Sequence, residues 1–453
     1  MQERLQHKLQ NRHIRMIAIG GAIGTGFFLG ASNAIRMTGP SITLAYILGG
    51  LIIYAIMRAL GEMTVDYPTS GSFVEYAHRY LGEGAGFVAG WNAWLLFTCA
   101  CMLEVTAVAT LLDYWVHVPH FITCAILLIL FGGVNLIGVK YFGETEFWFA
   151  GIKVAVIVFI IVAGIYLALF NSTVHQIALH NVHQDIGITT FFTNGFNGFL
   201  NSMSIVCLSF CGAEFVSVAA GEAENPKKSI PKAINGVIIR IILFYVLTIA
   251  VIVLISPVET IKANQNPFAE VFAKLGFHDS AGIINFVAIT AALSSLNSCI
   301  YVASRFLYRL AINGHAGQKF AKTDQKSLPR NAILFTIFIA FFVVIANYTF
   351  PAKILMYLFA IITVAIIINW YMILLSHMLF RKQAIATQKK LTYMMFGYPY
   401  INVLVMGLLF IILIVMSKST DMQLSVYIAP AWLLILSMIY ALGSGKKNLK
   451  LIK

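Results

Sequence analysis

The first long apolar stretch of the chain is interrupted by glycines in a pattern that could bind a small charged molecule. Residues 20–26 read Gly-Gly-Ala-Ile-Gly-Thr-Gly, and each glycine inside a helix costs about 1 kcal/mol relative to alanine. An unwound main chain is tolerated within a membrane only where it lines a cavity or is buried in protein. Gly20 and Gly24 also have the spacing that lets two helices pack closely, so close packing is the alternative to a binding site.

A second interruption lies in the sixth apolar stretch and contains a carboxylate. Residues 208–214 read Leu-Ser-Phe-Cys-Gly-Ala-Glu. An ionisable group inside a membrane is costly, which makes Glu214 a functional candidate. The alternative is a glutamate that is held by helix N–H donors for structural reasons.

Main-chain chemistry predicts what two such breaks can bind together. A half-helix that starts after Thr25 offers free N–H groups and the positive end of its dipole, which suit a carboxylate. The carbonyls near Ala22 and Ile23 suit an ammonium, and carbonyls of the second break could join them. A carboxylate and an ammonium a few ångströms apart describe an α-amino acid.

Two further ionisable side chains lie inside apolar stretches. Glu104 is in the middle of the third stretch, and either Glu104 or Glu214 could exchange a proton or contact the ligand. Lys153 lies in the fifth stretch, roughly 9 Å from its inner end at 1.5 Å per residue. From there Lys153 could extend its ammonium to the membrane interface.

These residues have to be positioned by membrane helices. Apolar residues make up 59% of the 453 positions and charged residues 11%, against roughly 45–50% and about 25% in soluble domains. This composition excludes a water-soluble globule and a disordered chain. Apolar runs of about 20 residues predict an all-α integral membrane protein with twelve transmembrane helices, at 14–36, 41–63, 85–111, 120–139, 147–170, 199–220, 235–256, 281–311, 332–349, 354–380, 398–417 and 423–443.

The basic residues predict the orientation of these helices. Short cytoplasmic loops are enriched in Lys and Arg. With the N-terminus inside, the outer connections contain few basic residues, namely Arg36, Lys262, Lys274, Lys353 and Lys418. An even number of spans then places both termini in the cytoplasm. The net charge of +13 is therefore attributed to inner loops that meet anionic lipid, and no nucleic-acid partner is expected.

The positions of the breaks predict an internal symmetry. Five helices separate equivalent points of spans one and six, so a duplicated five-helix unit must run in opposite directions in its two copies. Broken helices at equivalent positions of inverted repeats mark the substrate site of secondary transporters. The expected units are a first repeat at 14–170, a second at 199–380 and two additional helices at 398–443, with cytoplasmic tails at 1–13 and 444–453.

Other kinds of chemistry have little support. The six cysteines lie in apolar stretches without a Cys-x-x-Cys pair, so we interpret them as small core residues. The histidines His175, His180 and His183 have no matching ligand set, and no metal or other cofactor is predicted. There is no nucleotide loop or nucleophile elbow, and no cleavable signal peptide is expected.

The order of several short motifs identifies a family. The chain resembles the amino acid permeases of the amino acid–polyamine–organocation superfamily, in particular its bacterial amino acid transporter family. The resemblance rests on Leu9 to Arg15, Gly20 to Gly26, Gly39-Pro40-Ser41, Arg58 to Met63, Gly143 to Phe149 with Lys153, Ala220 to Ile234, Asn297-Ser298 and Ser304-Arg305.

The resemblance implies a leucine-transporter-like fold with five plus five inverted helices, helices one and six being broken. It implies proton-driven amino acid uptake across a bacterial inner membrane. It places the coupling in Lys153, whose ammonium would reach Ser294, with Glu104 and Glu214 as further candidates. The substrate would be bound by Ala22, Ile23, Gly24, Thr25, Gly26, Leu208, Ser209, Phe210, Cys211 and Gly212.

The sequence departs from the family pattern at two of these positions. Leu208 stands where close relatives usually have Phe, and Cys211 stands where they usually have Gly. Both changes affect the expected pocket wall, and Phe210 could supply the aromatic gate instead. The substrate class therefore stays open, with a neutral amino acid such as proline or an aromatic one favoured.

The sequence thus predicts a secondary amino acid/proton symporter with alternating access, acting as a monomer or weak homo-oligomer. An exchanger of amino acids or amines is the main alternative. A multipass membrane enzyme is a remote one, because no polar catalytic cluster lies at either membrane face. An enzyme is therefore not expected.

Overall fold

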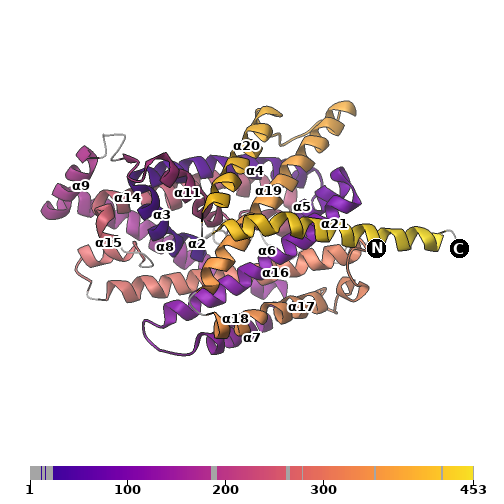
Figure 1. Ribbon diagram of the computed structural model, residues 1–453, viewed down its shortest axis with the longest axis horizontal. Helices are drawn as coiled ribbons and strands as arrows, with labels where there is room; N and C mark the ends of the chain where they lie inside the picture. The colour runs from indigo at the N-terminus through magenta and orange to yellow at the C-terminus, as the bar shows by residue number, and fades with distance from the viewer. Residues whose placement is uncertain are drawn as a thin grey trace.

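The computed structural model describes residues 12, 16, 24–184, 191–261, 266–277, 279–350, 353–419 and 422–451. Within this part of the chain the regular structure is entirely helical (Figure 1). The α-helices are α2 (Thr25–Phe28), α3 (Gly30–Thr38), α4 (Ile42–Asp66), α5 (Ser72–Tyr76), α6 (Glu83–Leu112), α7 (His120–Ile137), α8 (Val139–Phe170), α9 (Ser172–Gln184), α11 (Gly195–Ser209), α12 (Phe215–Ala219), α13 (Pro226–Arg240), α14 (Thr248–Ile255), α15 (Ala269–Lys274), α16 (Ser280–Ile312), α17 (Arg330–Ala340), α18 (Phe342–Thr349), α19 (Ile354–Ala386), α20 (Tyr400–Lys418) and α21 (Gln423–Leu451).

Ten helical segments of the described chain are long and apolar enough to cross a membrane. They are Gly30–Asp66, Glu83–Leu112, His120–Ile137, Tyr141–Phe170, Pro226–Ile255, Ser280–Ile312, Arg330–Thr349, Ile354–Ala386, Tyr400–Lys418 and Gln423–Gly443. The predicted first span falls partly on residues 17–23, outside the described residues, and the predicted sixth span is interrupted after Ser209. The prediction of an all-α, multi-helix membrane protein is confirmed.

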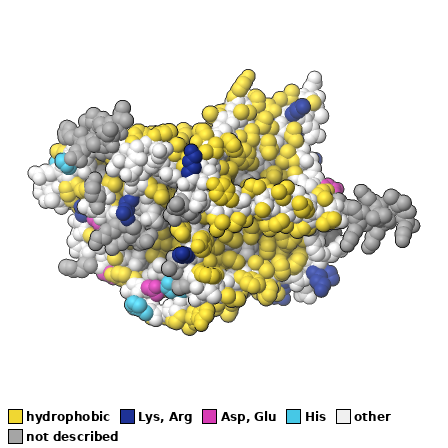
Figure 2. All heavy atoms as spheres, viewed as in Figure 1, with side chains coloured by type: hydrophobic (Ala, Val, Ile, Leu, Met, Phe, Trp, Pro, Cys, Tyr) yellow, Lys and Arg dark blue, Asp and Glu magenta, His cyan; other side chains and the backbone are white. Residues whose placement is uncertain are grey.

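The centre of the molecule is formed by α6 and α16, which run side by side in Figure 1. In each, 78% of the most apolar 18-residue window is buried, whereas the corresponding value for α21 is 6%. Apolar side chains also cover most of the face seen in Figure 2. A helix that is apolar on all sides must be buried in protein or face lipid, so α6 and α16 are the protein core and α21 is peripheral.

Buried ion pairs tie these central helices to their neighbours. Burying such a pair gains little by itself, but removing one partner is strongly destabilising because the other charge stays buried. These contacts therefore fix how α16 and α19 sit against the shorter segments. The pairs are Arg305 with Glu222 at 2.8 Å, Arg309 with Glu75 at 2.6 Å, and Arg381 with Glu62 at 2.6 Å.

One predicted helix start is wrong by about two turns. The fifth span was expected to begin at residue 147, because the preceding residues are polar. In the structure α8 begins at Val139, directly after Gly138, whose φ is 157°. The polar Glu146 belongs to this helix and is fully buried, so hydropathy alone could not place the start of the helix.

The two predicted breaks lie next to each other. Gly24 precedes α2, and α11 ends at Ser209 before α12 starts at Phe215. α3 packs along α11, and a Cβ on Gly26 would lie 3.3 Å from the carbonyl oxygen of Leu208. Glycine at this position therefore allows the main chains of the two broken segments to approach closely.

Candidate functional site

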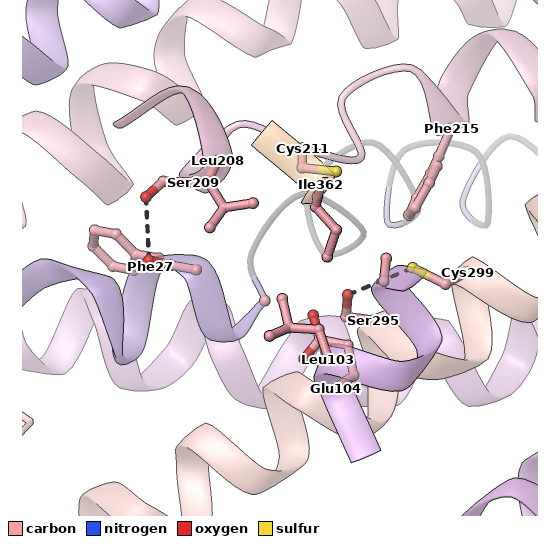
Figure 3. A pocket seen from close by; sticks show the side chains of 13 residues that line it. Phe27, Leu103, Glu104, Leu208, Ser209, Cys211, Phe215, Ser295, Cys299 and Ile362 are labelled. Carbon is pink, nitrogen blue, oxygen red and sulfur yellow. Dashed lines mark hydrogen bonds between the residues drawn. The ribbon is translucent and has the colours of Figure 1, made fainter. Parts of the chain in front are cut away.

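A small cavity of about 30 Å³ lies where the two breaks meet α6, α16 and α19 (Figure 3). Its lining is mainly apolar, with a carboxylate and two hydroxyls, which is the usual make-up of a small-molecule site. The volume is well below the range of about 300–1,000 Å³ for sites that hold drug-sized ligands. The lining residues are Gly24, Gly26, Phe27, Ala100, Leu103, Glu104, Leu208, Ser209, Cys211, Phe215, Ser295, Cys299 and Ile362.

The first break presents a helix N-terminus to this pocket. α2 begins at Thr25, and its N-cap residue is Gly24, which has no side chain to cap the helix. The side chain of Glu104 from α6 instead reaches the main chain of Thr25. N–H groups at a helix start attract anions, so this end of the pocket suits a carboxyl group.

The carboxylate of the sixth break has its hydrogen-bond partners within the protein. The amide of Gly212 donates to Glu214 Oε2 at 3.2 Å, and the indole N–H of Trp370 on α19 donates to Glu214 Oε1. Both carboxylate oxygens of this buried residue therefore have donors. Glu214 stabilises the turn of the break and does not line the pocket.

The carbonyls of the sixth break differ in their availability. The oxygen of Leu208 accepts from the amide of Cys211 at 3.0 Å, and that of Ser209 accepts from the hydroxyl of Tyr245 at 3.1 Å. The oxygen of Cys211 accepts no hydrogen bond within the described chain. A carbonyl oxygen can accept two hydrogen bonds, so these groups can still bind an ammonium, and Cys211 is the least committed.

Hydroxyls connect the two breaks at the edge of the pocket. Ser209 Oγ donates to the carbonyl of Gly26 at 3.3 Å (Figure 3). The hydroxyl of Tyr46 on α4 lies 3.3 Å from the same Ser209 hydroxyl. The ends of α2 and α11 are thus fixed relative to each other.

Glu104 extends from α6 toward the start of α2. Its side chain lies close to Thr25 and Ser295 and is 5% exposed. A Cβ on Gly24 would lie only 2.7 Å from Glu104 Oε1, and Oε2 has no hydrogen bond of ordinary length and angle. Glu104 is therefore a buried, incompletely satisfied carboxyl group at the edge of the pocket.

Behind the pocket, Lys153 and Ser294 come together as expected, with one addition. Lys153 Nζ donates to Ser294 Oγ at 2.9 Å. Ser294 Oγ also lies 2.7 and 2.8 Å from the two oxygens of Glu146, which was not among the predicted site residues. All three side chains are fully buried between α8 and α16.

The remaining predicted residues are distributed as follows. Ala22 and Ile23 lie outside the described residues. Phe210 is buried outside the pocket, where its ring lies 4.8 Å from that of Tyr245 and 6.2 Å from that of Tyr46. Gly212 has a φ of 95° and forms the turn of the break, without lining the pocket.

Several lining residues were not predicted from the sequence. Ser295 and Cys299 lie one helical turn apart on α16 and face the pocket together (Figure 3). The polar cluster Ser294, Ser295, Asn297 and Ser298 within an apolar helix was a signal that could have indicated them. Leu103, Phe215 and Ile362 are ordinary apolar residues, and only the fold shows that they line a cavity.

Comparison with known proteins gives a consistent result over nearly the entire chain. The amino acid permease family model matches residues 13–453. The chain is 40% identical to the aromatic amino acid transport protein AroP of Escherichia coli (strain K12), over 97% of this chain and 95% of the relative. It is equally similar, at 40%, to the AroP protein of Salmonella typhimurium (strain SL1344), with the same coverage of 97% and 95%. It is 38% identical to the uncharacterized transporter YdgF of Bacillus subtilis (strain 168), over 98% and 97%.

Proposed function

The chain belongs to the amino acid permease family, and on that premise we propose that it is a secondary transporter that imports a neutral amino acid together with a proton. Membership makes it a multi-pass membrane transporter for amino acids and not an enzyme. The identity of the amino acid, the coupling to protons and the direction of transport are the proposal.

The observation that carries the proposal is the pairing of opposite main-chain ends in one pocket. The helix N-terminus at Thr25 and Gly26 would bind the substrate carboxylate, because the N–H groups at a helix start and the helix dipole favour an anion. The carbonyl of Cys211, with those of Ala22 and Ile23, would bind the ammonium. The apolar wall would then receive an uncharged side chain.

The composition of that wall favours a neutral substrate. Leu103, Leu208, Phe215 and Ile362 line the pocket, and Glu104 is its one carboxylate among the described residues. The similarity to proteins named as aromatic amino acid transporters supports an aromatic substrate. Leu208, which the family resemblance places where an aromatic residue is expected, leaves proline and smaller apolar amino acids as competitors.

Glu104 supplies a physical reason for proton coupling. A substrate carboxylate at the start of α2 would lie beside the Glu104 carboxyl group. Two like charges this close in a buried site cannot both persist. Binding the amino acid and protonating Glu104 are therefore linked, and the substrate would enter with a proton. Lys153, bound to Ser294, would change how readily Glu104 is protonated. Glu214 would stabilise the sixth break.

The proposed architecture extends the ten segments to twelve spans, of which the first and sixth are broken. Spans one to five and six to ten would form inverted repeats, and α20 and α21 would lie outside them. Alternating movement of one repeat against the other would expose the pocket to each side in turn. The protein would lie in a bacterial inner membrane with both termini in the cytoplasm.

Uptake by purified protein in proteoliposomes tests the proposal. Radiolabelled phenylalanine, tyrosine, tryptophan, proline and leucine are supplied with and without an inward proton gradient. Accumulation of at least one of them above its external concentration, abolished by a protonophore, is the expected result. Equal uptake that requires a preloaded amino acid would identify an exchanger instead, and no uptake or exchange of any of the twenty amino acids would contradict the transporter function.

A further inference from the structure

Glu146 is a buried carboxylate that has no role in the proposed substrate site. It lies on α8, is 0% exposed and does not line the pocket. Its two oxygens lie 2.7 and 2.8 Å from Ser294 Oγ, which in turn accepts a hydrogen bond from Lys153 at 2.9 Å. One hydroxyl therefore joins an ammonium to a carboxylate, as acceptor from the first and donor to the second.

The spacing of these residues makes the contact a fixed feature of the helix pair. Positions 146 and 153 are seven residues apart, two turns of a helix, and so face the same side of α8. That side meets α16, where Ser298 also lies beside Glu146. One turn earlier, the rings of Phe142 and Tyr301 stack at 4.1 Å with an interplanar angle of 3°. The two helices are thus held in register at the point where the charges meet.

One buried ammonium in this region lies near two buried carboxyl groups. The charge of Lys153 interacts with both Glu146 and Glu104. One ammonium can neutralise one of them, and a second buried carboxylate would be left without compensation. Glu146 has a hydroxyl donor and does not line the pocket, whereas Glu104 lines the pocket and has an unsatisfied oxygen.

We propose that Glu146 is the permanent counter-ion of Lys153, a positioning residue that holds the ammonium against Ser294 and leaves Glu104 as the carboxyl group that exchanges the coupled proton. This assignment rests on the proposed function for its consequence in transport. The charge pairing itself is a property of the folded protein and can be tested without any transport measurement.

A double-mutant cycle of thermal stability tests the pairing. Glu146→Gln and Lys153→Met each remove one partner of the buried pair, and each should lower the melting temperature of the detergent-purified protein by about 5 °C or more. The double variant should lose clearly less than the sum of the two. Additive losses would overturn the pairing, whatever the uptake assay shows.

The matched control lies on the same helix. Glu144→Gln makes the same chemical change two residues away, at a partly exposed side chain that pairs with Arg12 at the surface. Surface pairs contribute little to stability, so its melting temperature should stay within about 1 °C of the wild type. A loss equal to that of Glu146→Gln would show that any charge removed from this end of α8 has the same effect, which would overturn the proposal.

The pH profile of uptake tests the positioning role. Among the described residues, the ionisable groups that interact with Lys153 are Glu146 from α8 and Glu104 from α6. Those near Glu104 are Lys153, Cys211 after α11 and Cys299 from α16, and Cys101 of α6 lies beside Cys299. Removing the negative charge of Glu146 leaves Lys153 free to stabilise a deprotonated Glu104. Protonating Glu104 would then require a higher proton concentration.

The midpoint of the pH profile of Glu146→Gln should therefore move to lower pH by about one unit, and it should return toward the wild-type value in the double variant with Lys153→Met. A lower maximal rate with an unchanged midpoint would show a merely structural residue and overturn the positioning role. If the wild-type protein transports no amino acid, the proposed function fails, while the stability cycle still decides the pairing.

Discussion

The two helix breaks meet at one pocket, but the carboxyl groups beside them are in different states. At the first break, Glu104 arrives from a different helix, reaches the main chain of Thr25 and lines the pocket. At the sixth break, Glu214 comes from the break itself and accepts a hydrogen bond from its own main chain at Gly212. Main-chain N–H groups attract anions at both breaks for the same physical reason, and only Glu104 of the two carboxyl groups lines the pocket.

This difference assigns separate roles to two buried glutamates that looked equivalent in the sequence. Glu214 is satisfied by an amide and an indole within the protein, so changing its charge would cost stability. Glu104 has an unsatisfied oxygen at the pocket, so its charge can change when a ligand binds. Substitutions at the two breaks should therefore separate transport from stability.

The largest effect is expected from Glu104→Gln. The amide has the shape of the protonated carboxyl group but cannot release a proton, so substrate binding should persist while coupling is lost. Proteoliposomes should then show exchange of labelled for unlabelled amino acid but no accumulation above the external concentration under a proton gradient. Full accumulation by this variant would remove Glu104 from the coupling mechanism.

The next effect is a loss of stability in Glu214→Ala. Two buried donors, the amide of Gly212 and the indole of Trp370, would lose their acceptor, at a cost of about 2–4 kcal/mol in the free energy of unfolding. Thermal unfolding in detergent measures the loss. Trp370→Phe removes one of the donors and should be milder, and combining the two should cost less than their sum. If Glu214→Ala kept a normal melting temperature and abolished gradient-driven uptake, Glu214 would be the residue that couples transport to protons, in place of Glu104.

A third pair of variants compares the glycines of the two breaks. A Cβ at Gly24 would lie 2.7 Å from Glu104 Oε1 and 3.1 Å from Ser295 Oγ. Gly24→Ala would therefore displace these side chains, and it should raise the KM for uptake by at least about tenfold, because small displacements of binding groups have large effects. At Gly212 the φ of 95° disfavours any side chain by about 1–2 kcal/mol. Gly212→Ala should thus lower the melting temperature and leave KM unchanged. KM measured on the folded fraction of each variant distinguishes the two, and the reverse pattern would contradict the assignment of binding to the first break and stability to the sixth.

The sequence indicated the breaks but not their difference. Glycines and a glutamate within apolar runs are visible in any single chain, because membrane helices rarely contain them. The partners of those residues come from elsewhere: Glu104 reaches α2 from α6, and Trp370 reaches Glu214 from α19. Hydropathy locates a span by its run of apolar residues, so it missed the start of α8, which is polar. This part of the helix contains Glu146, a buried polar residue whose hydrogen-bond partner Ser294 is almost 150 positions away.

The smallest predicted effect concerns two neighbours at the sixth break. Leu208 lines the pocket, whereas Phe210 packs against Tyr245 outside it. Leu208→Phe adds volume to the wall of a small pocket, so uptake of tryptophan relative to leucine should fall by about tenfold, the lower end of the effect of a size change in an apolar pocket. Competition assays with the two amino acids measure this ratio.

Phe210→Leu provides the matched control, since it makes the reverse exchange two residues away. It removes ring contacts with Tyr46 and Tyr245 in the core, so it should cost stability, about 1 kcal/mol, with an unchanged selectivity ratio. If Phe210→Leu shifted the ratio and Leu208→Phe did not, Phe210 would be the aromatic gate after all, and the sixth break would have to turn toward the pocket during transport. The selectivity ratio of these two variants therefore reports which face of the break the substrate meets.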